Sequence, residues 1–228
     1  IRGLPEPTKK LLLERGFDAN LLALLAEKHL KGHTNRIEGV VTPPEPSDLE
    51  TLPPEGSEEW ARLNALGEPF FRDGKVALVV MAGGMATRMG GVVKVLVEVF
   101  GGKTFLDLRL AEQRSFEEKY GKKVPLWLMT SEPTDEPIRQ ALAKANAPSD
   151  VVTFEQGLAV RLDESGRLFR DDAGAPSFCA TGHGDLVDAL RRSGLLARFV
   201  ASGGKYVVIA NVDNLGATPD PAIVGALV

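Results

Sequence analysis

The spacing of apolar residues changes near Lys75, and the change divides the chain into two parts. Before Lys75, leucines recur at helical spacing, and Asp18 is expected to cap a helix that ends near Gly32. After Lys75, short all-apolar runs alternate with amphipathic segments of helical length. We therefore predict that residues 1–72 form a helical extension, packed on a domain that occupies residues 73–228.

A proline-rich connector interrupts the helical part. Five prolines lie between residues 42 and 56, and they indicate extended backbone. A short helix is expected to begin after Ser57, where two glutamates occupy the first turn, and to end at Gly67.

The second part of the chain is predicted to be an α/β domain. The runs of apolar residues with strand length are 76–81, 95–100, 124–129, 151–154 and 206–210. Helices are expected after a Thr104–Asp107 capping box and over 134–145 and 184–197, with Pro137 confined to a first turn and a hairpin over 162–169. Because these strands are predominantly apolar, they predict a mixed, mostly parallel sheet covered by helices on both faces.

Composition narrows the function classes. The 228 residues are 43% hydrophobic and 25% charged, as in folded globular proteins, and the net charge is −4. No basic stripe is present, which argues against nucleic acid as a partner. The single cysteine, Cys179, cannot form an intrachain disulfide, and no apolar run reaches the ~18 residues of a membrane helix. We expect a cytoplasmic protein that does not enter a membrane, and homo-oligomerisation stays open.

A glycine-rich loop follows the first apolar run and carries the most informative chemistry. Gly83 and Gly84 let backbone amides approach a phosphate, and Arg88 and Lys94 add two cations. Arg88 could bind two phosphate oxygens at once, whereas Lys94 would act as a point charge. The alternative is a strand-to-helix turn that binds nothing.

Two common phosphate loops do not match this segment. From Gly84, the dinucleotide-binding spacing meets Ala86 and Met89 instead of glycine. The segment 101–104 imitates the end of a Walker A loop, but the earlier glycine of that motif falls on Val97. Residues 101–102 are better interpreted as a turn.

Four segments together resemble the UTP–glucose-1-phosphate uridylyltransferase family of sugar-nucleotide pyrophosphorylases. They are the glycine-rich loop 81–94 and the segments 104–108, 182–186 and 211–218, and the resemblance extends over 76–221. It implies a Rossmann-like nucleotidyltransferase domain of the glycosyltransferase-A-like type. It also implies Mg²⁺-dependent attack of a sugar-1-phosphate on the α-phosphorus of UTP, with UTP and glucose-1-phosphate as partners.

The resemblance assigns roles to particular residues. Met81, Ala82, Gly83 and Gly84 would contact the nucleotide, and Lys94 and Arg88 would act as catalytic cations at the phosphates. The residues assigned to the base and the sugar are Gln156 at the uracil edge, Gly182 against the base, His183 at phosphate or sugar and Asn211 at the sugar hydroxyls. Asp213 would contact the substrate and hold the metal.

Several alternatives stay open beside these assignments. Gln156 could be a surface glutamine, Asn211 and Asp213 could form only an Asx-turn, and Asp185 is expected to cap the helix that it begins. The sugar could be N-acetylglucosamine-1-phosphate, or the enzyme could accept several sugars. Ala86 stands where the family usually has glycine, and 92–94 reads Val-Val-Lys instead of Gly-Pro-Lys. These departures motivate a further alternative, a non-catalytic module that binds UDP-sugars.

Overall fold

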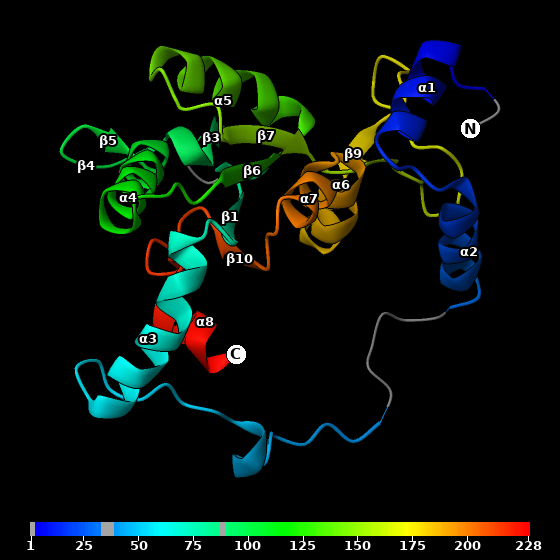
Figure 1. Ribbon diagram of the computed structural model, residues 1–228. Coiled ribbons are helices and arrows are strands. Elements are labelled where there is room, and N and C mark those ends of the chain that lie inside the picture. Colours follow the sequence, from blue (N-terminus) through cyan, green and yellow to red (C-terminus); the bar gives the residue numbers. More distant parts are fainter. Residues whose placement is uncertain (1–2, 33–38, 87–89) are drawn as a thin grey trace. The chain divides into compact units, whose positions relative to one another are not determined.

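A computed structural model describes residues 3–32, 39–86 and 90–228, and they form two compact units (Figure 1). Unit 1 comprises residues 1–51 and 157–181, and unit 2 comprises residues 52–156 and 182–228. The units differ from the predicted division at residue 72, because residues 52–72 belong to unit 2 and residues 157–181 belong to unit 1. In the described part of the chain, no helix is both long and apolar enough to cross a membrane.

Unit 1 combines two helices with a hairpin from the middle of the chain. The elements are α1 (Glu6–Glu14), α2 (Ala19–Leu30), the short 3₁₀ helix η1 (Pro46–Asp48), β8 (Leu158–Val160) and β9 (Phe178–Ala180). Leu4 and Leu12 pack with Leu158 and Val160 in its core. The Asp18 cap is confirmed, because its carboxylate accepts hydrogen bonds from two backbone amides of α2. The predicted hairpin over 162–169 is confirmed, because Leu162 forms an antiparallel bridge with Leu168 in the segment that connects β8 to β9.

Unit 2 is built on a parallel sheet in the order β10-β1-β6-β7. Its strands are β1 (Val76–Met81), β6 (Leu126–Thr130), β7 (Val151–Glu155) and β10 (Tyr206–Asn211). Neighbouring strands run parallel throughout, with Val76 beside Tyr206 and Leu126 beside Val151. The predicted α/β fold with a mostly parallel sheet is therefore confirmed.

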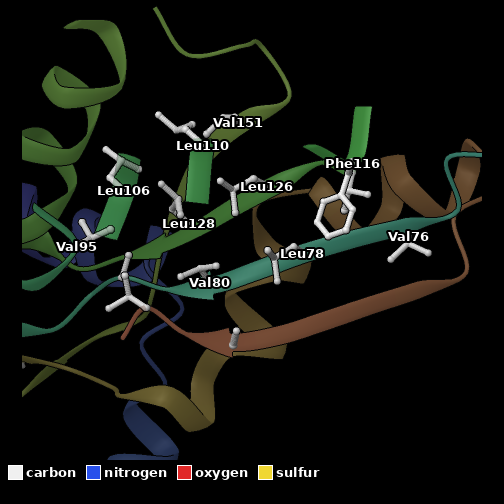
Figure 2. Packing of buried hydrophobic residues seen from close by; sticks show 14 of the residues in the cluster. Val76, Leu78, Val80, Val95, Leu106, Leu110, Phe116, Leu126, Leu128 and Val151 are labelled. Carbon is white, nitrogen blue, oxygen red and sulfur yellow. The ribbon is translucent and has the colours of Figure 1, made fainter. Parts of the chain in front are cut away.

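Each face of this sheet packs on its own helices, which explains the all-apolar strands. On β1, Val76, Leu78 and Val80 face α3 (Glu58–Arg72), α4 (Phe105–Tyr120), α5 (Glu132–Lys144) and α8 (Pro221–Ala226). Figure 2 shows these side chains against those of α4 and β6. Ala77 and Val79 point to the other face, toward α6 (Leu186–Arg192) and α7 (Leu195–Ala201).

Several predicted boundaries are wrong. The strand over 95–100 is replaced by η3 (Lys94–Leu96) and β4 (Glu98–Phe100), which pairs with β5 (Lys103–Thr104) across the predicted glycine turn. The helix over 184–197 is divided at Gly194, whose φ of +73° ends α6 and starts α7. Pro137 lies inside α5 and not in its first turn, because Ser131 caps the helix earlier than expected.

Gly67 does not end α3, which continues to Arg72. Gly67 instead lies against the backbone of α8, where a Cβ would be 1.8 Å from the Pro221 carbonyl oxygen. Gly225 makes the reciprocal contact, since a Cβ there would be 1.9 Å from the Leu63 carbonyl oxygen. The absence of a side chain at Gly67 and at Gly225 thus allows α3 and α8 to pack closely within unit 2.

We expect Gly67→Ala to lower the free energy of unfolding by about 2 kcal/mol, because the added methyl group must separate two helix backbones. At a helix position without such a contact, the same change stabilises by ~1 kcal/mol, so the sign is diagnostic. Urea unfolding measures the change. The control variant is Ala65→Gly at an exposed position of the same helix, where alanine is expected to be the more stabilising of the two residues. Stabilisation by Gly67→Ala would contradict the α3–α8 contact.

Candidate functional site

The strands of the parallel sheet end at one edge, and most of the predicted site residues lie there. Met81 ends β1 and lies beside Asn211, the last residue of β10, and beside Met129 of β6. Ala82 continues this pattern by donating its backbone N–H to the Met129 carbonyl oxygen. In open parallel sheets, ligands bind beyond the carboxyl ends of the strands. The fold therefore brings the start of the glycine-rich loop and the Asn211 segment to the edge where a ligand is expected.

Gly83, Gln156 and Gly182 converge at this edge from three separate segments. The Gln156 side chain is buried, and its Oε1 accepts a hydrogen bond of 3.2 Å from the Gly182 N–H. A Cβ on Gly83 would lie 2.5 Å from Gln156 Nε2, so a side chain there would displace this amide. Gly182 has a φ of +88°, which glycine adopts without strain. The burial of the Gln156 side chain also argues against the alternative that it is a surface glutamine.

Ser131 contacts the glycine-rich loop and was not among the site residues predicted from the sequence. Its hydroxyl donates a hydrogen bond of 2.8 Å to the Gly83 carbonyl oxygen, which holds the loop against the start of α5. Its position directly after the apolar run of β6, three residues before Thr134, is the pattern of a helix cap and could have identified it.

Lys94 and Asp213 form an ion pair, although 119 residues separate them. Lys94 Nζ donates to Asp213 Oδ2 at 2.6 Å. The glycine-rich loop brings Lys94 to this point, because β2 (Met85–Ala86) pairs with β3 (Val92–Val93) and the Lys94 N–H donates to the Gly84 carbonyl oxygen. The structure thus joins the predicted phosphate-binding cation to the predicted metal ligand.

The ion pair also lowers the pKa of Asp213. The hydrogen bond from Lys94 holds the pKa of the Asp213 carboxyl below its ordinary value, with a smaller contribution from its own backbone N–H. The carboxylate is ionised at neutral pH, as it would be at the ordinary aspartate pKa, and its side chain is 45% exposed. An exposed, ionised carboxylate suits a hard cation such as Mg²⁺, which takes few protein ligands and completes its shell with water and phosphate oxygens. Within the described residues, no group of three or more His, Cys, Asp or Glu side chains could hold a metal.

The other predicted site residues are exposed or lie outside the described part of the chain. His183 is exposed in η4 (His183–Asp185), and Asn211 is exposed at the end of β10. Arg88 lies outside the described residues. Asp185 stands at the N-cap position of α6 as expected, but its carboxylate makes no capping hydrogen bond to the helix and instead accepts a hydrogen bond of 2.8 Å from Arg192.

Known proteins resemble this chain in both sequence and fold. The family model for UTP–glucose-1-phosphate uridylyltransferase matches residues 25–228. The enzyme of that name from Musa acuminata is 34% identical over 215 residues, which cover 90% of this chain and 44% of that protein. The one from Hordeum vulgare is 32% identical and covers 100% of this chain and 49% of its own length. The chain thus spans less than half the length of these curated relatives.

Solved structures give the same result for the fold. The UDP-glucose phosphorylase from Trypanosoma brucei superposes with a TM-score of 0.69 at 26% identity, covering 91% of this chain and 42% of that one. The uridine diphosphate N-acetylglucosamine pyrophosphorylase from the same organism has a TM-score of 0.63 at 24% identity, covering 74% and 38%, and shares the fold. The sequence match extends over most of the chain and includes the glycine-rich loop, the Gly182 segment and the Asn211–Thr218 segment, so the chain belongs to the UTP–glucose-1-phosphate uridylyltransferase family.

Proposed function

We propose that this chain carries the nucleotide-binding site of an enzyme that forms UDP-glucose and pyrophosphate from UTP and glucose-1-phosphate. The observation that carries the proposal is the Lys94–Asp213 ion pair at the carboxyl edge of the sheet. It sets a cation for the phosphates beside a carboxylate for a metal, and in-line phosphoryl transfer depends on this kind of charge neutralisation. Family membership supports the same reaction.

The cluster of Gly83, Gln156 and Gly182 would receive the uracil base. A primary amide has two donor hydrogens and a carbonyl oxygen, so Gln156 can match both the donor and the acceptor on the uracil edge. The glycines on either side leave the base room to approach the backbone, and a side chain at Gly83 would press on the Gln156 amide. The Ser131 hydroxyl would hold the loop in this arrangement through the Gly83 carbonyl.

The triphosphate would lie along the glycine-rich loop. Backbone amides of 81–84 would face its oxygens, and Lys94 would neutralise part of their charge, together with Arg88 as a second cation. An oxygen of the sugar phosphate forms a bond to the α-phosphorus, while the bond from that phosphorus to the bridging oxygen breaks and pyrophosphate leaves. The attacking phosphate monoester is already ionised at neutral pH because its second pKa is ~6, so the step requires no general base.

Asp213 is the residue that we propose to hold Mg²⁺. When bound, the ion would stabilise the negative charge of the pyrophosphate leaving group. Asp213 would then share or exchange its contact with the Lys94 ammonium, and a Lys94 that is exchanged would be free to bind a phosphate. The exposure of both side chains permits the exchange without unpacking the core.

The sugar would lie near Asn211 and His183. Asn211 could bond the sugar hydroxyls through its amide, and His183 would contact phosphate or sugar without transferring a proton. Glucose-1-phosphate is the proposed substrate, and N-acetylglucosamine-1-phosphate is the alternative that a substrate panel decides. A cytoplasmic location is part of the proposal and agrees with the free thiol of Cys179.

Exchange of labelled pyrophosphate into UTP tests the reaction in the complete protein. We expect exchange that requires both UDP-glucose and Mg²⁺ and is at least tenfold slower with UDP-N-acetylglucosamine. Lys94→Ala should slow it by about a hundredfold, as expected for loss of one charge contact in the transition state (~3 kcal/mol). Lys103→Ala, which removes an exposed lysine from β5, is the matched control. Tight UTP binding without exchange for any UDP-sugar would instead indicate the non-catalytic module.

The role of Asp213 predicts the metal dependence. Asp213→Asn keeps the size of the side chain but removes the charge that Mg²⁺ requires. We expect the Mg²⁺ concentration for half-maximal exchange to rise at least tenfold, with the thermal midpoint of unfolding changed by no more than a few degrees. Asp188→Asn, on the exposed surface of α6, is the control for loss of one negative charge. An unchanged Mg²⁺ response in Asp213→Asn would assign Asp213 a purely structural role.

The ion pair itself predicts a pH effect. Because Lys94 lowers the pKa of the Asp213 carboxyl, the pair stabilises the folded chain above the ordinary aspartate pKa. This stabilisation is lost as the pH falls through the lowered pKa. In Lys94→Met, we expect the Asp213 pKa to rise toward ~3.9, measured by carbon NMR of the carboxyl group. Asp107 is the internal control, because hydrogen bonds from Thr104 lower its pKa. An unmoved Asp213 pKa would mean that the pair does not form in solution.

A further inference from the structure

Arg109 is a charged side chain in the interior of unit 2. It lies in α4 between Leu106 and Leu110, and only 1% of its surface is exposed. The two leucines pack in the sheet core, so the rotation of α4 that buries them buries Arg109 as well. A buried guanidinium costs free energy unless its donors are satisfied. Its contacts therefore indicate what this residue is for.

The Arg109 guanidinium holds one loop, and the loop is remote in sequence. Nη2 donates to the Asn214 carbonyl oxygen at 2.7 Å, and Nη1 donates to the Ala217 carbonyl oxygen at 3.3 Å. Nη1 also pairs with Glu112 Oε2 at 2.8 Å, which balances the charge. The planar guanidinium of arginine presents its N–H donors in a rigid fork, so it can donate to two separate carbonyls at once. The ammonium group of lysine is a compact point charge without this geometry. Arg109 thus fixes the loop after β10 by its backbone.

This loop presents Asp213. On one side of Asp213, Val212 is buried in the sheet core with 2% of its surface exposed. On the other side, the Asn214 carbonyl is held by Arg109 and also accepts the Ala217 N–H. Asp213 is therefore anchored at both neighbours, and its exposed carboxylate reaches Lys94.

We propose that Arg109 is a positioning residue, which sets Asp213 opposite Lys94 by holding the carbonyls of Asn214 and Ala217. The contact with Asp213 is indirect, so Arg109 touches neither substrate nor metal. Its role in the reaction rests on the proposed function, whereas its hold on the loop does not.

Hydrogen exchange tests the hold on the loop, with or without activity. In Arg109→Met, the amides of Asn214, Ala217 and Thr218, which bond within the loop, should exchange at least tenfold faster. The amides of β1 should change by less than threefold, and Arg114→Met, an exposed arginine on the same helix, should leave the loop unchanged. Equal acceleration in the loop and in β1 would mean general destabilisation and would overturn the proposal.

A double-mutant cycle tests whether Arg109 acts through Asp213. The readout is the Kd of UTP measured by calorimetry in the complete protein with Mg²⁺ present. We expect Arg109→Met to weaken binding about tenfold when Asp213 is present, but less than twofold in the Asp213→Asn background. The same loss in both backgrounds would show that Arg109 does not act through Asp213.

A conservative variant covers failure to fold. If Arg109→Met does not fold, Arg109→Lys is compared, since it keeps the cation but can hold fewer carbonyls. Loop exchange that is faster than in the unaltered protein, with UTP affinity that is weaker but not lost, would support positioning. Values equal to those of the unaltered protein would overturn it. If the unaltered protein binds no UTP, the proposed function fails, and hydrogen exchange alone decides the role of Arg109 in holding the loop.

Discussion

The burial of β1 on both faces is the constraint from which the rest of unit 2 follows. Its apolar residues alternate between two cores, so helices must cover the sheet on each side. The parallel pairing of β1 with β10 and β6 then brings the carboxyl ends of three strands together. Each segment that leaves this edge begins beside the others, although the segments are far apart in sequence.

The candidate site uses this edge in two chemically different ways. Where a base is proposed to bind, the chain places a buried amide between glycines, and shape decides what fits. Where phosphates are proposed to bind, it places an exposed lysine against an exposed aspartate. The first arrangement holds a buried side chain, whereas the second can exchange one cation for another because both side chains reach solvent.

Contacts to the backbone also hold α3, α8 and the loop after β10 in place. Gly67 and Gly225 let α3 and α8 approach to a distance that no side chain permits. Arg109 holds the loop that connects β10 to α8 by its carbonyl oxygens. The loop carrying Asp213 is thus fastened by the core on one side and by α4 on the other.

The sequence by itself determined the features that depend on neighbouring residues. Short apolar runs that alternate with helical segments predicted β1, β6, β7 and β10. The capping residues Asp18, Ser57 and Thr104 predicted where three helices start, because a cap involves residues only a few positions apart. Motif order identified the family. Only the tertiary structure decided that α3 passes through Gly67, that Gln156 meets Gly182, and that Lys94 and Arg109 reach the loop around Asp213. Local pattern carries no information on these contacts, since their partners are brought together by strand order and helix packing.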